Sequence, residues 1–194
     1  MNARAARVLT LPVVSEPVAA HPAVERRDYG DGVLVLFPFG APVSLRRAEP
    51  ADAAPVHALL EQHVAEGRVL PRSLGQIYRT IRDFVIAVQD DAVVGSASLR
   101  IHSAGLAEVA ALAVAPACQG RGVGRRMVET LVDEARALGI ARVFALTLED
   151  GFFHRLGFRT GSVAEFPEKL AADCSGCAKR THCVEICVVR DLAT

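Results

Sequence analysis

"EVAALAVAPACQGRGVG", residues 108–124, joins a run of small apolar residues to a cluster of glycines. The apolar run is rich in Val and Ala and is closed by Pro116, which predicts a buried strand. Beyond the cluster, apolar residues recur at helical spacing, with charged residues on the opposite face, up to Gly139. The sequence therefore predicts a strand, a glycine turn and an amphipathic helix in direct succession.

Two interpretations of the glycine cluster follow from the residues. Gly120, Gly122 and Gly124 could serve only to let the chain turn sharply. Alternatively, the backbone N–H groups at the helix start, which have no intrahelical partner, could bind phosphate oxygens. Gln119 and Arg121 would then add a donor and a positive charge. The G-x-G-x-G spacing matches neither the dinucleotide-binding fingerprint nor the P-loop.

Length, composition and charge limit the classes of function. A chain of 194 residues can form one domain with a full core. Its formal net charge of zero gives no reason to expect binding to nucleic acid or to an anionic membrane. No apolar run approaches the roughly 20 residues of a membrane helix, and no secretory signal is recognisable. The expected location is the cytoplasm.

The remaining segments suggest an α/β (α+β) domain over residues 29–194, preceded by a loose arm over residues 1–28. Helices are expected after Asp52 and after Ser73, each of which is a suitable N-cap. Asp90-Asp91 is expected to turn a hairpin. The expected order is strands, two helices, a three-strand meander, the long helix, a strand, a short helix and a closing strand.

Two motifs give the chain a family resemblance. Gln119 to Gly124 matches the Q/R-x-x-G-x-G/A signature of the GNAT superfamily of acyl-CoA N-acyltransferases, and "FFHRLGF" (152–158) stands where that family has "FYxxLGF". Together with "FPEKL" (166–170), these segments resemble the acetyltransferase domain of N-acetylglutamate synthases, most of all their short stand-alone form. "LPRS" (70–73) and "RDFVIAV" (82–88) share this likeness.

The resemblance implies a fold and an activity. The fold would be a mixed, mostly antiparallel sheet covered by helices. The activity would be transfer of an acetyl group from acetyl-CoA to the α-amine of L-glutamate or L-glutamine, the first step of arginine biosynthesis. Two alternatives stay open: a GNAT enzyme acting on another amine (a polyamine, a drug or a protein N-terminus), and a non-catalytic module that binds acyl-CoA or metal. A homodimer is also compatible with the sequence.

The resemblance further implies a coenzyme A site, because in that family the loop amides bind the pyrophosphate and the preceding strand hydrogen-bonds the pantetheine arm. A strand N–H near Leu112 to Val114 would meet the oxyanion. The expected coenzyme residues are Leu112, Ala113, Val114, Gln119, Gly120, Arg121, Gly122, Val123, Gly124, Arg125 and Phe153.

Candidate catalytic and substrate residues follow the same likeness. Glu108 is the candidate general base for the substrate amine, and its alternative is an ordinary carboxylate at a strand end. Phe153 replaces the Tyr that many family members use as an acid, so no side-chain acid is available there. Arg suits a substrate carboxylate, although each Arg could equally be a solvated surface charge. The expected substrate residues are Arg46, Arg72, Ser73 and Arg180.

A cysteine-bearing segment, residues 174–187, closes the domain. Its thiols have the spacing C-x2-C-x5-C-x3-C, and His182 lies among them. Thiolates at such spacing can hold a structural Zn²⁺, although the spacing is not that of a standard zinc ribbon. The alternative is a set of reduced thiols, with the last one buried in a strand. The candidate metal ligands are Cys174, Cys177, Cys183 and, as the fourth, either Cys187 or His182.

Overall fold

The computed structural model describes residues 33–35, 42–177 and 182–192, so the arm expected over residues 1–28 lies outside the described residues. The strands are β1 (Val33–Val35), β2 (Val43–Arg47), β3 (Phe84–Gln89), β4 (Ala92–Ser103), β5 (Leu106–Val114), β6 (Arg142–Thr147), β7 (Arg159–Thr160) and β8 (Ile186–Asp191). The helices are α1 (Ala53–Ala65), α2 (Leu74–Thr80), α3 (Val123–Ala137), α4 (Asp150–His154) and α5 (Pro167–Ala172).

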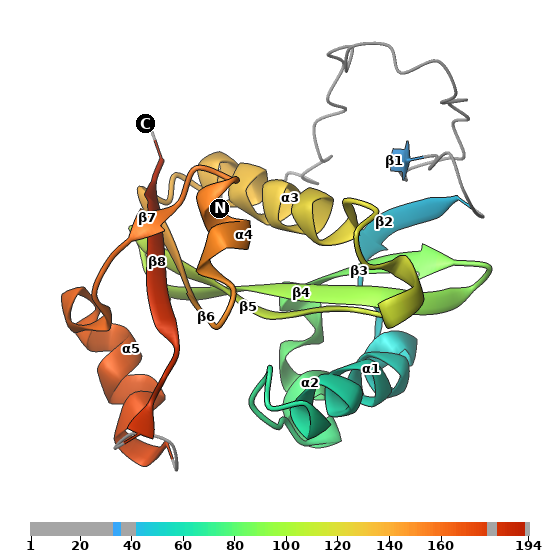
Figure 1. The fold of residues 1–194 in the computed structure, drawn as a ribbon, viewed down its shortest axis with the longest axis horizontal. Coiled ribbons are helices and arrows are strands. Elements are labelled where there is room, and N and C mark those ends of the chain that lie inside the picture. Colours follow the sequence, from blue (N-terminus) through green and yellow to red (C-terminus); the bar gives the residue numbers. More distant parts are fainter. Residues whose placement is uncertain (1–32, 36–41, 178–181, 193–194) are drawn as a thin grey trace, which may run out of the picture.

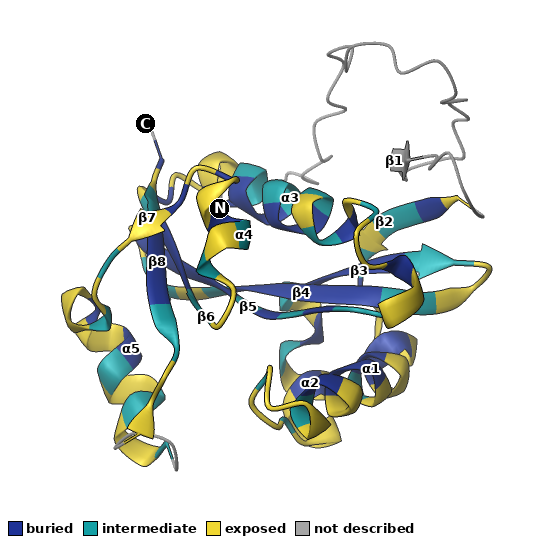
Figure 2. Ribbon diagram, in the orientation of Figure 1, coloured by how far each residue is buried: buried dark blue, intermediate teal, exposed yellow. Residues whose placement is uncertain are grey.

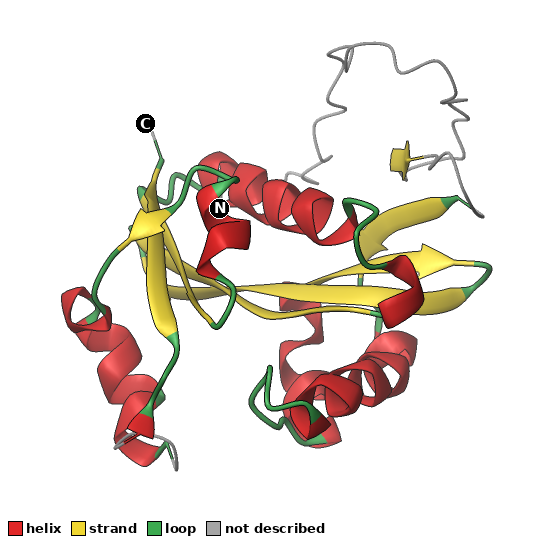
Figure 3. Ribbon diagram, viewed as in Figure 1, coloured by secondary structure: helices red, strands yellow, loops and turns green. Residues whose placement is uncertain are grey.

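The described strands form one sheet in the order β1-β2-β3-β4-β5-β6-β8-β7. Neighbouring strands are antiparallel except β5 and β6, which are parallel. The expected mixed, mostly antiparallel sheet is therefore confirmed. Figure 3 shows helices on both sides of these strands.

Strands β5 and β6 pair over only three residues, from Leu106 opposite Arg142 to Glu108 opposite Phe144. Beyond that point β5 continues beside β4, and β6 continues beside β8. The sheet therefore opens between β5 and β6 toward their C-terminal ends. We call this opening the notch.

Strand β5 also carries a β-bulge next to the notch. Ser98 lies opposite Ala110 and Ser96 lies opposite Ala113, so one residue of β4 faces two of β5. Within the bulge Ala111 has a φ of 52°, in the left-handed region that L-residues seldom adopt.

Two helical layers bury the two faces of the sheet. Helices α3 and α4 cover one face, and α1 and α2 cover the other, where α5 also lies, beside β8 (Figure 1). Figure 2 shows the buried residues concentrated in the central strands and on the sheet-facing sides of the helices. The α3 side contains Met127, Leu131 and Phe153, whereas the α1 side contains Leu60 and Phe84.

Most expected elements are confirmed, with differences in their local chemistry. Ser73 caps α2 in a capping box with Gln76, whereas Asp52 precedes α1 without capping it. The Asp90-Asp91 turn is confirmed, and both residues have positive φ. Helix α5 was not expected, although "PEKLAAD" has proline at its first position and good helix formers after it. No described helix is long and apolar enough to span a membrane.

Candidate active site

The glycine loop connects β5 to α3 as the sequence predicts. Gly120 and Gly122 have φ values of 71° and 78°, and Gly122 is the N-cap residue of α3. A side chain at either position would meet no atom within 4 Å, so backbone conformation rather than crowding requires glycine there. The first N–H groups of α3, like those of any helix, have no intrahelical partner, which suits the oxygens of a pyrophosphate.

The start of this loop is anchored through one carbonyl. The side-chain amide of Gln119 donates to the Val114 carbonyl at 2.9 Å, and Nε2 of buried His63 in α1 lies 3.2 Å from the same oxygen. The Gln119 side chain therefore links the loop to the last residue of β5. His63, to which sequence reasoning gave no role, ties α1 to the end of β5.

Other expected coenzyme residues lie around the loop and the notch. Leu112 and Val114 are partly buried on β5, and a Cβ at Gly124 would make ordinary contact with Val114 and the Phe152 ring. Arg125 pairs with Glu129 one helical turn later, at 2.8 Å. Leu112 and Val114 thus pack against the α3-side core, next to the start of the glycine loop.

Phe153 belongs to the core rather than to the surface of the loop. It is 4% exposed and packs edge-on against Phe152 and Phe158. Phe152 lies nearer the loop, because its ring is within 3.6 Å of the position that a Cβ of Gly124 would take. Of the two phenylalanines, Phe152 is therefore the one that lies against the glycine loop.

Glu108 lies near the other end of β5, inside a cluster of charged side chains. It is 4% exposed, and its carboxylate accepts from Lys169 Nζ at 2.7 Å and from His102 Nε2 at 3.0 Å. Arg100 Nη1 lies 3.4 Å away. Asp173, just after α5, accepts two hydrogen bonds from Arg100 and one from Lys169. We call Arg100, His102, Glu108, Lys169 and Asp173 the ion cluster.

The cluster sets the ionisation of its carboxylates. Burial by itself would raise the pKa of Glu108, but hydrogen bonding from His102 and the charges of Lys169 and Arg100 outweigh it and lower that pKa. The pKa of Asp173 is likewise held far below its usual range by Arg100 and Lys169. Both carboxylates are therefore ionised at neutral pH, and Glu108 is a weaker base than an isolated Glu.

Arg72 is the expected substrate residue that lies close to this cluster. It is partly buried in the loop between α1 and α2, and makes no hydrogen bond or ion pair with another described residue. Burial and the nearby charge of Arg100 lower its pKa, while Glu108 and Asp173 oppose that shift. Arg72 therefore offers an unpaired guanidinium beside the ion cluster.

The structure places the other expected substrate residues differently. Arg46 forms a bidentate ion pair with Asp52, at 2.6 and 2.8 Å, so a carboxylate of the chain itself already engages both of its terminal nitrogens. The Ser73 hydroxyl accepts from the Gln76 N–H as a helix cap. Arg180 lies outside the described residues.

The described cysteines do not form the expected four-thiol site. Cys187 is buried in β8, and burial raises the pKa of its thiol to about 11. Cys183 is exposed, and Cys174 and Cys177 are half-buried. Among the described residues, the side chains that gather closely enough to hold a metal are His102, Glu108 and Asp173. Lys169 and Arg100 already supply positive charge there, so a structural zinc is not supported.

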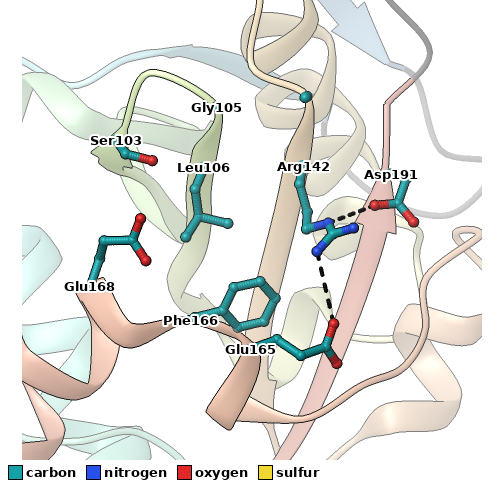
Figure 4. Close-up of a pocket in the computed structure, with 9 residues that line it drawn as sticks. Ser103, Gly105, Leu106, Arg142, Glu165, Phe166, Glu168 and Asp191 are labelled. Carbon is teal, nitrogen blue, oxygen red and sulfur yellow. Dashed lines mark hydrogen bonds and ion pairs between the residues drawn. The ribbon is translucent and has the colours of Figure 1, made fainter.

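A separate hollow of about 340 Å³ lies at the edge of β5 and β6 near the start of α5 (Figure 4). Arg142 lies in it, paired with Asp191 at 2.6 Å and with Glu165 at 3.8 Å. Glu168 also lines it. Its cation is already paired, and none of the expected site residues lines it.

Sequence reasoning missed four members of the ion cluster. Arg100 and His102 come from β4, and Lys169 and Asp173 come from α5 and the residue after it. Arg100 and His102 are two residues apart on one strand, as neighbours on one face of a sheet must be. That spacing was the available signal for these two residues. The contribution of α5 had no local signal.

Comparison with known proteins agrees with this geometry. Residues 57–158 match the acetyltransferase (GNAT) family. An uncharacterised N-acetyltransferase of Chlorobaculum tepidum is 36% identical over 78% of this chain and 98% of its own length. The amino-acid acetyltransferase of Neisseria meningitidis is 34% identical over 72% of this chain, which spans only 33% of that relative.

A solved structure gives the same result for the fold. The N-acetylglutamate synthase of Neisseria gonorrhoeae, complexed with coenzyme A and N-acetyl-glutamate, is 32% identical and superposes with a TM-score of 0.71. The match covers 80% of this chain and 36% of that one. With the family match and the glycine loop at the end of β5, the chain belongs to the GNAT family and is an acetyl-CoA-dependent N-acetyltransferase.

Proposed function

We propose that this N-acetyltransferase acetylates the α-amine of L-glutamate or L-glutamine and so performs the first step of arginine biosynthesis. The observation that carries the proposal is Arg72, a partly buried guanidinium with no partner among the described residues, beside a second arginine. An unpaired guanidinium favours a carboxylate-bearing acceptor and disfavours a polyamine. The gonococcal synthase, whose structure holds N-acetyl-glutamate, supports the same choice.

The proposed reaction uses the two ends of β5. Acetyl-CoA binds with its pyrophosphate at Gly120 to Gly124 and its pantetheine along Leu112 to Val114. The neutral amine attacks the thioester carbonyl, so an N–C bond forms, a C–S bond breaks and coenzyme A leaves as the thiolate. Glu108 receives the amine proton through water, because its carboxylate already accepts from Lys169 and His102. Phe153 has no proton to give, so solvent protonates the thiolate.

The first test measures thiol release from acetyl-CoA with L-glutamate, L-glutamine, L-arginine and spermidine as acceptors. We expect kcat/KM to be highest for glutamate or glutamine. A preference for spermidine would retain the N-acetyltransferase and overturn the proposed acceptor.

The second test examines Arg72 directly. Loss of a charge-assisted hydrogen bond costs about 1.5–3 kcal/mol, so Arg72→Ala should raise the KM for glutamate roughly tenfold to a hundredfold. The KM for acetyl-CoA should not change. Arg68→Ala is the matched control, because Arg68 is exposed on the same loop and pairs only with Glu66 among the described residues. Equal KM values for both variants would remove Arg72 from the acceptor site.

A further inference from the structure

Two buried serines of β4 lie against the β5 bulge. Ser98 is 1% exposed, and its hydroxyl donates to the Ala110 carbonyl at 3.2 Å. Ser96 is fully buried, and its hydroxyl donates to the Ala111 carbonyl, also at 3.2 Å. Two successive carbonyls of β5 are therefore held by side chains of the same neighbouring strand.

This arrangement differs from that of a regular strand, in which successive carbonyls point to opposite neighbours. Here the positive φ of Ala111 turns its peptide, so the carbonyls of Ala110 and Ala111 both face β4. In a planar trans peptide, the N–H points opposite to the preceding C=O. The N–H groups of Ala111 and Leu112 therefore both point away from β4.

The side of β5 opposite β4 is the side of the notch. Pairing of β5 with β6 ends at Glu108 opposite Phe144, before the bulge begins. The bulge lies on β5, a few residues after Glu108. The glycine loop begins after the end of that strand. Two adjacent N–H donors thus face the space between the proposed base and the proposed coenzyme loop.

We propose that Ser96 and Ser98 are positioning residues for acetyl transfer. Their hydroxyls hold the peptides that follow Ala110 and Ala111, so that the N–H groups of Ala111 and Leu112 donate to the thioester oxygen. When the amine attacks, that oxygen gains negative charge and both donors stabilise it. The serines form no covalent bond and transfer no proton in this step. The proposal rests on acetyl transfer itself and not on the choice of glutamate as acceptor.

A merely structural role for the serines makes a different prediction. Buried hydroxyls that only satisfy carbonyls would alter stability on removal and leave the bound thioester and kcat unchanged. Serines that orient the N–H donors would change the polarisation of the thioester and lower kcat, with little effect on the KM for acetyl-CoA.

The first experiment needs no acceptor. The carbonyl stretching frequency of acetyl-CoA labelled with ¹³C at the carbonyl is measured by infrared difference spectroscopy, bound to the wild-type protein and to Ser96→Ala/Ser98→Ala. We expect a shift to lower frequency in the wild type and loss of most of that shift in the double variant. An equal shift in both proteins would overturn the proposal.

The second experiment measures kcat with the best acceptor of the panel above. The double variant should lose about 10-fold to 100-fold in kcat, below the effect of deleting an oxyanion donor outright. Ser98→Thr keeps the hydroxyl and should retain most of the activity. Ala97→Gly is the control for loosening of β4, since Ala97 is fully buried between the two serines, belongs to the α3-side core and has no hydroxyl to donate.

The outcomes separate this inference from the proposed acceptor. Wild-type turnover of spermidine alone would refute glutamate and still allow the serine variants to be tested. Full kcat in the double variant, whatever the acceptor, would refute the positioning role. If the double variant does not fold, Ser96→Ala and Ser98→Ala alone are compared by the same two measurements.

Discussion

The glycine loop and the ion cluster lie at opposite ends of β5, yet they are built in different ways. The loop uses consecutive residues from Val114 to Gly124, and the groups that we propose bind the coenzyme are its backbone N–H donors. The ion cluster combines side chains from β4, β5 and α5 that are up to 73 residues apart in sequence. A site made of adjacent backbone can be read from a motif, whereas a site made of distant side chains exists only after the sheet and α5 have assembled.

Replacing the Glu108 carboxylate tests this comparison with the largest expected effect. Glu108→Gln should lower kcat by about 100-fold or more, the range for loss of a general base, while acetyl-CoA affinity stays within about twofold. Steady-state kinetics and calorimetric titration measure the two effects. Glu168→Gln, a change of the exposed neighbour of Lys169, should leave both values unchanged. Unchanged turnover in the Glu108 variant would exclude this residue from the chemistry.

The second prediction concerns the stability that the ion cluster adds. Lys169 is buried against Glu108 and Asp173, so Lys169→Met should lower the free energy of unfolding at pH 7 by about 3 kcal/mol. Both carboxylates have lowered pKa values in the folded state, so their contribution is present at neutral pH and is lost as the pH falls below about 4.

The pH dependence of the free energy of unfolding serves as the control for the Lys169→Met variant. Urea unfolding of the wild type should show stability falling steeply on acidification below the ordinary carboxyl range. The Lys169→Met variant should show a shallower dependence, since its carboxylates are less strongly shifted. Parallel curves for the two proteins would mean that Lys169 does not set the ionisation of the cluster.

The third prediction tests the backbone character of the loop. Gly122→Ala places a side chain in open space but forces an L-residue into a φ of 78°, at a cost of about 1–2 kcal/mol. We expect coenzyme A affinity to weaken roughly tenfold, with little change in the KM for the amine. Gly105→Ala, also in open space but without a positive φ, should bind coenzyme A normally.

The smallest expected effect belongs to Arg46. Because both of its terminal nitrogens pair with Asp52 and its side chain is partly exposed, Arg46→Ala should cost at most about 1 kcal/mol of stability. The KM for glutamate should stay within about twofold of wild type. A large rise in that KM would show that Asp52 releases Arg46 to the substrate, and would extend the acceptor site beyond Arg72.

Elements whose signals are local follow directly from the amino-acid sequence. The apolar run of β5, the helical period of α3 and the glycines between them are adjacent in the chain, so their order fixes the strand-turn-helix unit. The Ser73 capping box and the Asp90-Asp91 turn depend likewise on a few consecutive residues. The family likeness in residues 119–124 and 152–158 extended these local signals to a fold and an activity.

Which charged side chains pair with one another depends on tertiary packing. Nothing local to Arg46 indicates that it pairs with Asp52 while Arg72 stays unpaired among the described residues, nor that Lys169 lies against Glu108. The bulge at Ala111 is equally hidden, because its cause is the register of β4 against β5. Pair energies depend on distance and burial, and both arise only when segments far apart in sequence pack together.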